Sequence, residues 1–278
     1  MPNYPRAKKS LGQHFLTDTH ILGKIVDAGN VSSKDVVLEI GPGRGALTRA
    51  LLDSGARVVA VEKDEGLATL LREELKEYCE DARLVIIEGD ILDMRTILQT
   101  ELLCVPTKEE GGATYKVVAN IPYYITGKIL RFLFSLDTLP ASIVLLIQDE
   151  VARRITVQEG KKESILSLSI KAFGTPSYKG KIKAGSFSPA PKVDSAILSI
   201  DQISRDYFDT FTEIQFFDVI KKAFSQKRKT LQNTLFQDNK ERGAQILKNF
   251  GLSATVRPEE LTLEMWKKLI IEMKHENQ

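Results

Sequence analysis

Cysteine and histidine are scarce in this chain of 278 residues, which contains two cysteines and three histidines. Cys79 and Cys104 sit in unlike contexts without metal-ligand spacing, and the histidines are scattered over positions 14, 20 and 275. This pattern does not fit a disulfide framework, and it offers no metal site. We therefore expect a reduced cytoplasmic protein without a bound metal.

Long apolar runs are also missing. No stretch reaches the length needed to cross a bilayer, and the first residues, MPNYPRAKKSLGQ, lack the apolar core of a secretory signal. The composition is 42% hydrophobic and 27% charged, as in soluble globular proteins. These features predict a soluble protein without a membrane partner.

Acidic residues are absent from three stretches of the chain, although the net charge is only +2. The stretches are 1–14, 179–192 and 219–237, and each contains at least three lysines or arginines. Local basic patches favour contact with phosphate groups. The candidate RNA-binding residues in the last stretch are Lys221, Lys222, Lys227, Arg228 and Lys229. The alternative is that they are ordinary solvated side chains.

Short apolar runs alternate with segments of helical periodicity through the first 200 residues. The predicted strands are Val36–Ile40, Arg57–Val61, Leu84–Ile87, Tyr115–Ala119, Ser142–Ile147, Tyr178–Ala184 and Val193–Ile200. The predicted helices are Ala46–Leu52, Leu67–Tyr78, Gly127–Phe134, Glu150–Val157 and Lys162–Phe173. Strands and helices alternating at short spacing predict a parallel sheet covered by helices, closed here by an antiparallel hairpin. The expected class is α/β, with a Rossmann-like, seven-stranded, mostly parallel sheet of the class I methyltransferase type.

Beyond Ile200 the pattern is helical only. The predicted helices are Phe216–Phe224, Arg228–Phe236, Arg242–Phe250 and Glu259–Lys274. We therefore expect two domains. The first covers residues 1–204 and begins with a basic arm at 1–20, and the second is a small all-helical domain at 205–278. Residues 99–114 look like a polar surface loop without an assigned role.

A glycine-rich turn, Gly41-Pro42-Gly43-Arg44-Gly45, follows the first predicted strand. Glycines at this place let the backbone approach a ligand and present amide groups at a helix N-terminus. Glu62 follows 21 residues after Gly41 (62 − 41) at the tip of the next strand, where an acid typically binds ribose hydroxyls. Asp90, at the tip of the third strand, can accept a hydrogen bond from an adenine amine. The alternative for both acids is a solvated carboxylate at a strand end.

Glu62 suits either a nicotinamide dinucleotide or S-adenosyl-L-methionine, because both contain adenosine. The glycine spacing is G-x-G-x-G rather than the G-x-G-x-x-G of dinucleotide sites. The fourth strand also ends in Asn-Ile-Pro-Tyr, a signature of enzymes that methylate exocyclic amines. Both features favour the methyl donor.

The tetrapeptide Asn120-Ile121-Pro122-Tyr123 is the expected catalytic centre. The side-chain oxygen of Asn120 and the carbonyl of Ile121 can accept both hydrogens of an adenine amine, whose lone pair would then point at the methyl donor. Catalysis would depend on alignment and electrostatics, without an obvious general base. Tyr123 can stack on an unstacked base, and Phe187 is the expected opposing wall. The alternative for both rings is a place in the hydrophobic core.

The sequence resembles the ribosomal RNA adenine N6-dimethyltransferases, specifically their small-subunit branch. The stretches that resemble the family are Lys9–Leu16, Glu39–Gly45, Asn120–Tyr124, Phe187–Ser195 and Phe224–Leu235. The resemblance runs from about residue 7 to residue 270. One departure is Ala190, which replaces the second proline of the Phe187 loop.

The resemblance implies transfer of four methyl groups from S-adenosyl-L-methionine to two adjacent adenosines near the 3′ end of 16S rRNA. It implies S-adenosyl-L-homocysteine as product and a monomer that acts on a pre-assembled small ribosomal subunit during its biogenesis. It also implies a helical RNA-binding domain and a donor site. The implied donor-site residues are His14, Leu16, Gly41, Gly43, Gly45, Glu62, Lys63, Asp90, Ile91 and Asn120.

Three alternatives remain at this stage. The large-subunit branch of the same superfamily methylates a single adenine, and the basic segment at 224–235 argues against it. A non-catalytic RNA-binding factor on the same fold would not need the glycine turn, the two strand-end acids and Asn120. A dehydrogenase is the most distant alternative and would bind a nicotinamide cofactor.

Overall fold

The computed structural model describes residues 7–8, 12–93, 115–157 and 162–275. The described chain forms two compact units, one of residues 1–152 and 176–203 and one of residues 153–175 and 204–278. The expected loop at 99–114 lies outside the described residues. No helix in the described ranges is long and apolar enough to span a membrane.

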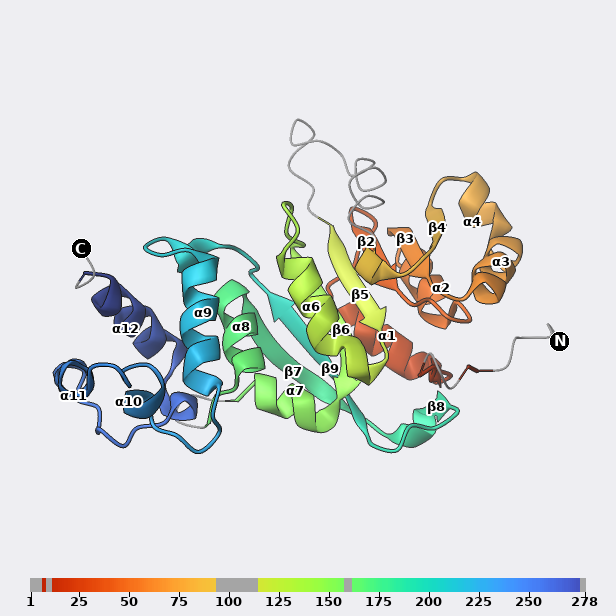
Figure 1. The fold of residues 1–278 in the computed structure, drawn as a ribbon. Coiled ribbons are helices and arrows are strands. Elements are labelled where there is room, and N and C mark those ends of the chain that lie inside the picture. Colours follow the sequence, from red (N-terminus) through yellow and green to blue (C-terminus); the bar gives the residue numbers. More distant parts are fainter. Residues whose placement is uncertain (1–6, 9–11, 94–114, 158–161, 276–278) are drawn as a thin grey trace. The chain divides into compact units, whose positions relative to one another are not determined.

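The first unit is built on a seven-stranded sheet with the strand order β4-β3-β2-β5-β6-β9-β7 (Figure 1). The strands are β2 (Val36–Ile40), β3 (Arg57–Glu62), β4 (Leu84–Glu88), β5 (Lys116–Asn120), β6 (Ser142–Gln148), β7 (Thr175–Ile182) and β9 (Ser195–Asp201). Strands β2 to β6 pair in parallel and β9 pairs antiparallel with β6. The predicted seven-stranded, mostly parallel sheet is confirmed.

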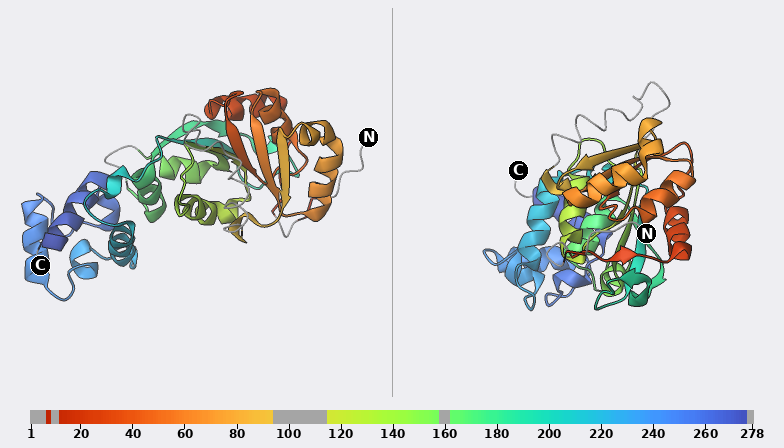
Figure 2. Two further views of the ribbon diagram at one scale, coloured as in Figure 1. Left: turned by 90° about the horizontal axis from the view of Figure 1, so that it is seen from above. Right: turned by 90° about the vertical axis from the view of Figure 1, so that its right-hand side faces the viewer.

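The strands at the centre of the sheet are apolar because helices cover both faces of the sheet. All five residues of β2 are buried, as expected for a strand of an internal parallel sheet. Helices α1 (Thr19–Ala28) and α2 (Ala46–Asp53) lie on one face, and α6 (Thr126–Phe134) lies on the other (Figure 2). Helix α7 (Asp149–Ile155) follows β6 directly.

Two elements at the N-terminus escaped sequence analysis. Helix α1 is N-capped by Asp18, whose side chain accepts a hydrogen bond from the His20 amide. Strand β1 (Phe15–Leu16) pairs antiparallel with β8 (Phe187–Ser188) in a separate two-stranded sheet. Two residues are too few to give a strand periodicity, so β1 is defined only by its distant partner.

The single helix predicted at 67–78 is two helices. Helix α3 (Glu65–Glu74) and helix α4 (Lys76–Glu80) meet at Leu75, whose φ of −115° and ψ of 27° are not helical. Asp64 caps α3 by accepting a hydrogen bond from the Gly66 amide. The helical periodicity of this segment continues across the break, so the pattern did not reveal it.

The second unit is helical. It contains α8 (Ile165–Phe173), α9 (Glu213–Phe224), α10 (Leu231–Thr234), α11 (Lys240–Asn249) and α12 (Leu263–His275). Its core surrounds Phe216 and Trp266, both fully buried, and includes Leu168 and Ala172 of α8. The segment 153–175 therefore groups with this unit, whereas sequence analysis assigned it to the first domain.

The predicted helix Arg228–Phe236 is wrong at its start, because α10 begins only at Leu231. Thr230, with φ of −78° and ψ of 162°, is extended and occupies the N-cap position. The Lys229 amide donates to the Gln226 carbonyl at 3.1 Å and closes a turn. We call residues 225–230 the basic turn. It carries Lys227, Arg228 and Lys229, which are all exposed.

Candidate active site

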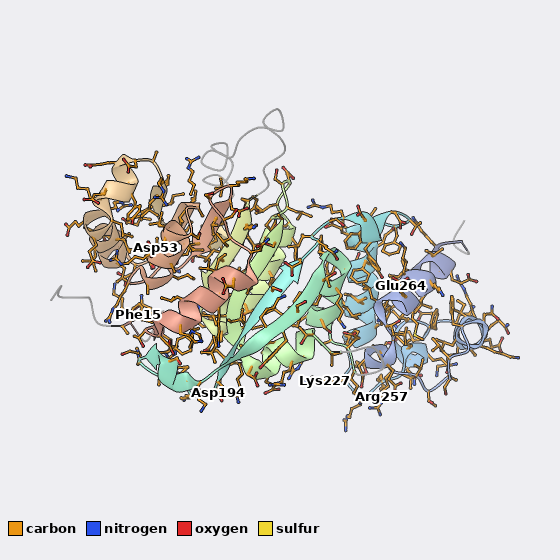
Figure 3. The ribbon with its side chains drawn as sticks, turned by 180° about the vertical axis from the view of Figure 1, so that it is seen from behind. Phe15, Asp53, Asp194, Lys227, Arg257 and Glu264 are labelled. Atoms are coloured by element: carbon orange, nitrogen blue, oxygen red, sulfur yellow. The ribbon has the colours of Figure 1, made fainter. Side chains whose placement is uncertain are left out.

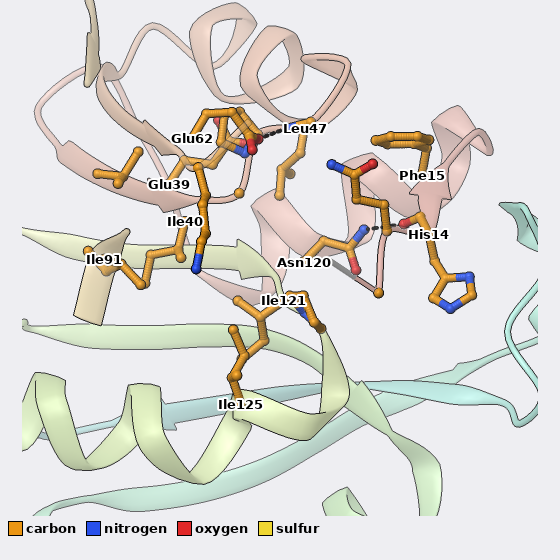
Figure 4. A pocket seen from close by; sticks show the side chains of 18 of the residues that line it. His14, Phe15, Glu39, Ile40, Leu47, Glu62, Ile91, Asn120, Ile121 and Ile125 are labelled. Atoms are coloured by element: carbon orange, nitrogen blue, oxygen red, sulfur yellow. Dashed lines mark hydrogen bonds between the residues drawn. The ribbon is translucent and has the colours of Figure 1, made fainter. Parts of the chain in front are cut away.

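A pocket of about 310 Å³ lies at the carboxyl ends of the parallel strands of the first unit. The chain segments that follow β2, β3, β4 and β5 line it, together with residues of the N-terminal segment (Figure 4). In the sheet, Ile40 is paired with Val61 on one side and Ala119 on the other, so the strand ends meet at one edge. This edge is where α/β sheets commonly bind ligands.

The glycine turn adopts backbone angles that favour glycine. Gly41, Gly43 and Gly45 have φ values of +69°, +60° and +74°. Gly41 and Gly43 line the pocket. Gly45 does not, and a Cβ there would approach the Leu71 side chain to 2.5 Å. Gly45 therefore lies close to Leu71 of α3, and its implied ligand contact stays a prediction.

Residues of the N-terminal segment pack onto this turn. A Cβ on Gly43 would lie 3.0 Å from the Phe15 ring, and the Arg44 guanidinium lies 4.4 Å from the centroid of the same ring. Lys8 forms an ion pair of 2.9 Å with Asp64, just beyond β3. Phe15 was not predicted as a site residue, and only the fold brings it to the glycine turn.

Glu62 is only 5% exposed and anchors the glycine turn to the end of β3. One carboxyl oxygen accepts a hydrogen bond from the Gly43 amide at 2.9 Å, and the other accepts one from the Asp64 amide at 2.8 Å. Burial raises the pKa of Glu62, and these amides counteract the rise in part. Glu62 lines the pocket, and its binding of ribose hydroxyls stays a prediction.

Asp90 follows β4, lines the pocket and pairs with Lys63 at 2.6 Å. Burial raises the pKa of Asp90, but Lys63 and the Leu92 amide outweigh this and lower it overall. The pairing with Asp90 raises the pKa of Lys63 in turn. Ile91, which is buried, contributes apolar surface next to this pair.

Asn120 has a fixed orientation. Its side-chain nitrogen donates a hydrogen bond to the His14 carbonyl at 3.1 Å, and Figure 4 shows the amide held in this way. The side-chain oxygen therefore remains as the acceptor on this pocket-lining residue. Ile121 and Pro122 follow in the pocket wall, with the Ile121 side chain buried.

Tyr123 is half-buried and its hydroxyl lies 2.6 Å from the Ser195 hydroxyl. Burial raises the pKa of Tyr123, so the phenol is neutral at physiological pH. The His14 ring stacks nearby, with centroids 6.4 Å apart and an interplanar angle of 17°. His14 Nδ1 is 2.7 Å from the Pro189 carbonyl, which ties the N-terminal segment to the loop after β8. Leu16 is buried beside it and lines the pocket.

Phe187 does not line the pocket, in contrast to the expected base-stacking wall. Its side chain is 5% exposed and belongs to the hydrophobic core of the first unit. Its backbone pairs with Leu16 in the small sheet. The β1–β8 pairing turns this ring inward, and the pairing is invisible in the local sequence.

Glu39 is a pocket residue whose role sequence analysis missed. It is 1% exposed, and neither carboxyl oxygen has a hydrogen-bond partner among the described residues. Burial raises its pKa to about 8, the Thr48 hydroxyl partly offsets this rise, and Glu62 adds to it. The sequence does indicate this residue, because Glu39 is an acid inside the apolar run VVLEI.

Tyr124 and Lys128 also line the pocket and were not predicted as site residues. Both side chains are exposed. The described residues contain no cluster of three or more potential metal ligands. The predicted RNA-binding side chains, Lys221, Lys222, Lys227, Arg228 and Lys229, lie in the second unit at the end of α9 and in the basic turn, and all five are exposed.

Comparison with known proteins identifies relatives over nearly the whole chain. Residues 5–275 match the ribosomal RNA adenine dimethylase family. Ribosomal RNA small subunit methyltransferase A of Dehalococcoides mccartyi (strain CBDB1) is 38% identical over 271 residues, covering 96% of this chain and 88% of that protein.

Two solved structures resemble this one over most of its length. A dimethyladenosine transferase from Plasmodium falciparum has a TM-score of 0.76 at 25% identity, covering 95% of this chain and 98% of that chain. The 23S rRNA methyltransferase ErmE has a TM-score of 0.70 at 24% identity, covering 94% and 99%, and this likeness shows the fold alone. The chain has a class I methyltransferase fold with a pocket at the ends of its parallel strands. Nearly all of its residues match one family model, and the chain belongs to the ribosomal RNA adenine dimethylase family.

Proposed function

We propose that this protein transfers methyl groups from S-adenosyl-L-methionine to N6 of two adjacent adenosines near the 3′ end of small-subunit rRNA. Membership in the adenine dimethylase family supports the reaction, and the small-subunit methyltransferase relatives support the substrate. The orientation of Asn120 is the observation that carries the proposal. Its nitrogen is occupied by His14, so its oxygen is available to accept a hydrogen from an adenine amine.

The lining of the pocket suits the chemical groups of the methyl donor. The donor carries a cationic sulfonium and an ammonium group, and Glu39 offers a buried carboxyl without a partner. Gly41 and Gly43 line the pocket, and glycine backbone can approach a ligand closely. Glu62 would bind the ribose hydroxyls and Asp90 the adenine amine. When bound, the donor supplies an electrophilic methyl group.

Asn120 and Ile121 would prepare the acceptor nitrogen. The lone pair of an adenine amine is delocalised into the ring, which makes the nitrogen a poor nucleophile. Two acceptors that hold both amine hydrogens favour a pyramidal nitrogen whose lone pair is localised. The methylated nitrogen then loses a proton readily to water, because it is strongly acidic, so positioning and electrostatics supply the catalysis.

The acceptor is proposed to be rRNA within a pre-assembled small subunit, bound by a monomer in the cytoplasm. The target base must leave its stack to reach the pocket, where Tyr123 offers a half-buried aromatic ring. The exposed lysines and arginine of the basic turn would contact phosphates outside the pocket.

Transfer of a labelled methyl group to under-methylated small and large ribosomal subunits tests the proposal. We expect label on the small subunit and N6,N6-dimethyladenosine upon nucleoside analysis. Label on the large subunit would instead support the large-subunit branch. Donor binding without transfer to either subunit would support a non-catalytic RNA-binding factor.

A further inference from the structure

Tyr124 is an aromatic side chain left in solvent at the pocket. It is 68% exposed, and it is the sole aromatic among the described large hydrophobic residues that are more than a third exposed. The others are Ile165, Val193, Ile214 and Met265, none of which lines this pocket. Tyr124 therefore combines apolar exposure with a position at the mouth of the proposed active site.

The local backbone explains why Tyr124 points outward while Tyr123 points inward. Both residues lie in a 3₁₀ turn, Tyr123–Ile125, where successive side chains are about 120° apart. The Tyr123 hydroxyl is held by Ser195. The turn itself is fixed, because the Ile125 amide donates to the Pro122 carbonyl at 3.2 Å.

One side of the Tyr124 ring is supported by the N-terminal segment. Gly12 has φ of +61°, and a Cβ there would lie 3.2 Å from the Tyr124 ring and 3.4 Å from Pro122. The glycine backbone thus packs closely against the ring. With 68% of the residue exposed, the remaining surface is free for a ligand.

Charged side chains of both signs line the pocket together with Tyr124. Lys63 and Lys128 line the same pocket and are both exposed. Lys63 forms an ion pair of 2.6 Å with Asp90, and Lys128 forms none among the described residues. An exposed aromatic ring in a pocket that also carries the exposed Lys128 fits a nucleotide, whose base stacks on the ring and whose phosphate is attracted to the ammonium group.

We propose that Tyr124 stacks on the nucleobase that flanks the target adenosine in single-stranded RNA. The inference rests on the proposed function, since the target base itself must reach Asn120 and Tyr123. A base stacked on Tyr124 lies outside the position of the target base, because the side chains of Tyr123 and Tyr124 leave the 3₁₀ turn in different directions. Phe187, buried in the core, cannot serve as this platform.

Steady-state methylation of under-methylated small subunits by Tyr124→Ala, Tyr124→Phe and Tyr124→Trp tests the inference. Loss of one base–aromatic stack should raise KM for the subunit about 5-fold to 150-fold in Tyr124→Ala. The phenylalanine and tryptophan variants retain an aromatic face and should remain within about 3-fold of wild type. The affinity for S-adenosyl-L-methionine, measured by calorimetry, should not change in any of them.

Ile214→Ala is the matched control, because Ile214 is 73% exposed and does not line the pocket. It should leave KM unchanged. An unchanged KM in Tyr124→Ala, with an active wild type, overturns the inference and leaves the proposed function intact. An equal rise in KM for Tyr124→Phe also overturns it, because the hydroxyl rather than the ring would then be responsible. An inactive wild type would instead contradict the proposed function.

Discussion

The pocket of the first unit and the basic turn of the second unit differ in how firmly their side chains are held. In the pocket, the Gly43 amide holds the Glu62 carboxylate and the His14 carbonyl holds the Asn120 amide. The Glu39 side chain is buried. In the basic turn, Lys227, Arg228 and Lys229 extend into solvent, and none forms an ion pair within the described ranges. Figure 3 shows Lys227 and Arg257 among the surface side chains of this unit.

The pocket depends on the geometry of its side chains, whereas the basic turn depends on their charge. A pocket that aligns a reacting nitrogen depends on direction and distance, so an isosteric change can abolish its function. A solvated basic turn acts through the number of its charges and is screened by salt. Substitutions that preserve charge but change shape should therefore impair the pocket and leave the basic turn unaffected.

The largest effect is expected from Asn120→Ala in the pocket. Removing the oriented amide oxygen should lower kcat for methyl transfer about 100-fold to 1000-fold, because the acceptor nitrogen loses its alignment. Donor binding should remain largely intact and is measured by calorimetry. Near-normal turnover would contradict the role given to Asn120.

Glu39→Gln should stabilise the protein without its donor. The pKa of Glu39 is raised to about 8 from an ordinary value of 4.5, so the folded state retains a proton that the unfolded state has released. Wild-type stability therefore falls as pH rises from about 4.5 to about 8, and the loss is complete above that range. Glutamine removes this dependence, and the variant should be more stable by about 2–4 kcal/mol at pH 8.

Thermal unfolding between pH 5 and pH 9 measures this difference. The Tm of wild type and variant should be close at pH 5 and should diverge as pH rises. A constant difference in Tm across the range would show that Glu39 does not titrate there.

Glu62→Gln should weaken donor binding about 10-fold to 100-fold, because one charged acceptor is lost from the glycine turn and the proposed ribose contact. The matched control is Glu88→Gln, since Glu88 pairs with Glu62 in the sheet register but is exposed and does not line the pocket. Calorimetric titration with S-adenosyl-L-homocysteine compares the two variants. Equal affinities would contradict the donor role of Glu62.

Replacing Lys227, Arg228 and Lys229 together by glutamine should have a smaller, salt-dependent effect. RNA affinity should fall about 10-fold at low salt, and the slope of log affinity against log salt should decrease by about 2–3. Exchanging lysine and arginine at the three positions retains the charge and should change little. If the triple variant keeps the wild-type affinity and slope, the basic turn is only a solvated surface.

Local patterns predicted most of the first unit. The apolar runs located all seven strands of the sheet within a few residues, and the register brought the predicted Gly41, Glu62, Asp90 and Asn120 to one pocket. Parallel pairing alone places successive strand ends together, so these pocket residues could be chosen from the sequence. The start of α10 and the break at Leu75 were missed, because periodicity does not mark where a helix stops.

Contacts between distant segments were beyond sequence analysis. Phe187 is buried because β8 pairs with β1, 171 positions away (187 − 16), and Asn120 is oriented by a carbonyl 106 positions away. The state of Glu39 was likewise beyond sequence analysis, because its carboxyl is buried and unpaired only in the packed sheet.

The sequence by itself determined the sheet, the glycine turn, the strand-end acids and the family, because each depends on short-range pattern or residue identity. The tertiary structure alone decided which aromatic rings face the pocket, with Phe187 in the core and Tyr124 in solvent. The physical reason is that burial depends on what packs against a side chain. For these two rings the packing partners are Leu16 and Gly12, far away in the chain.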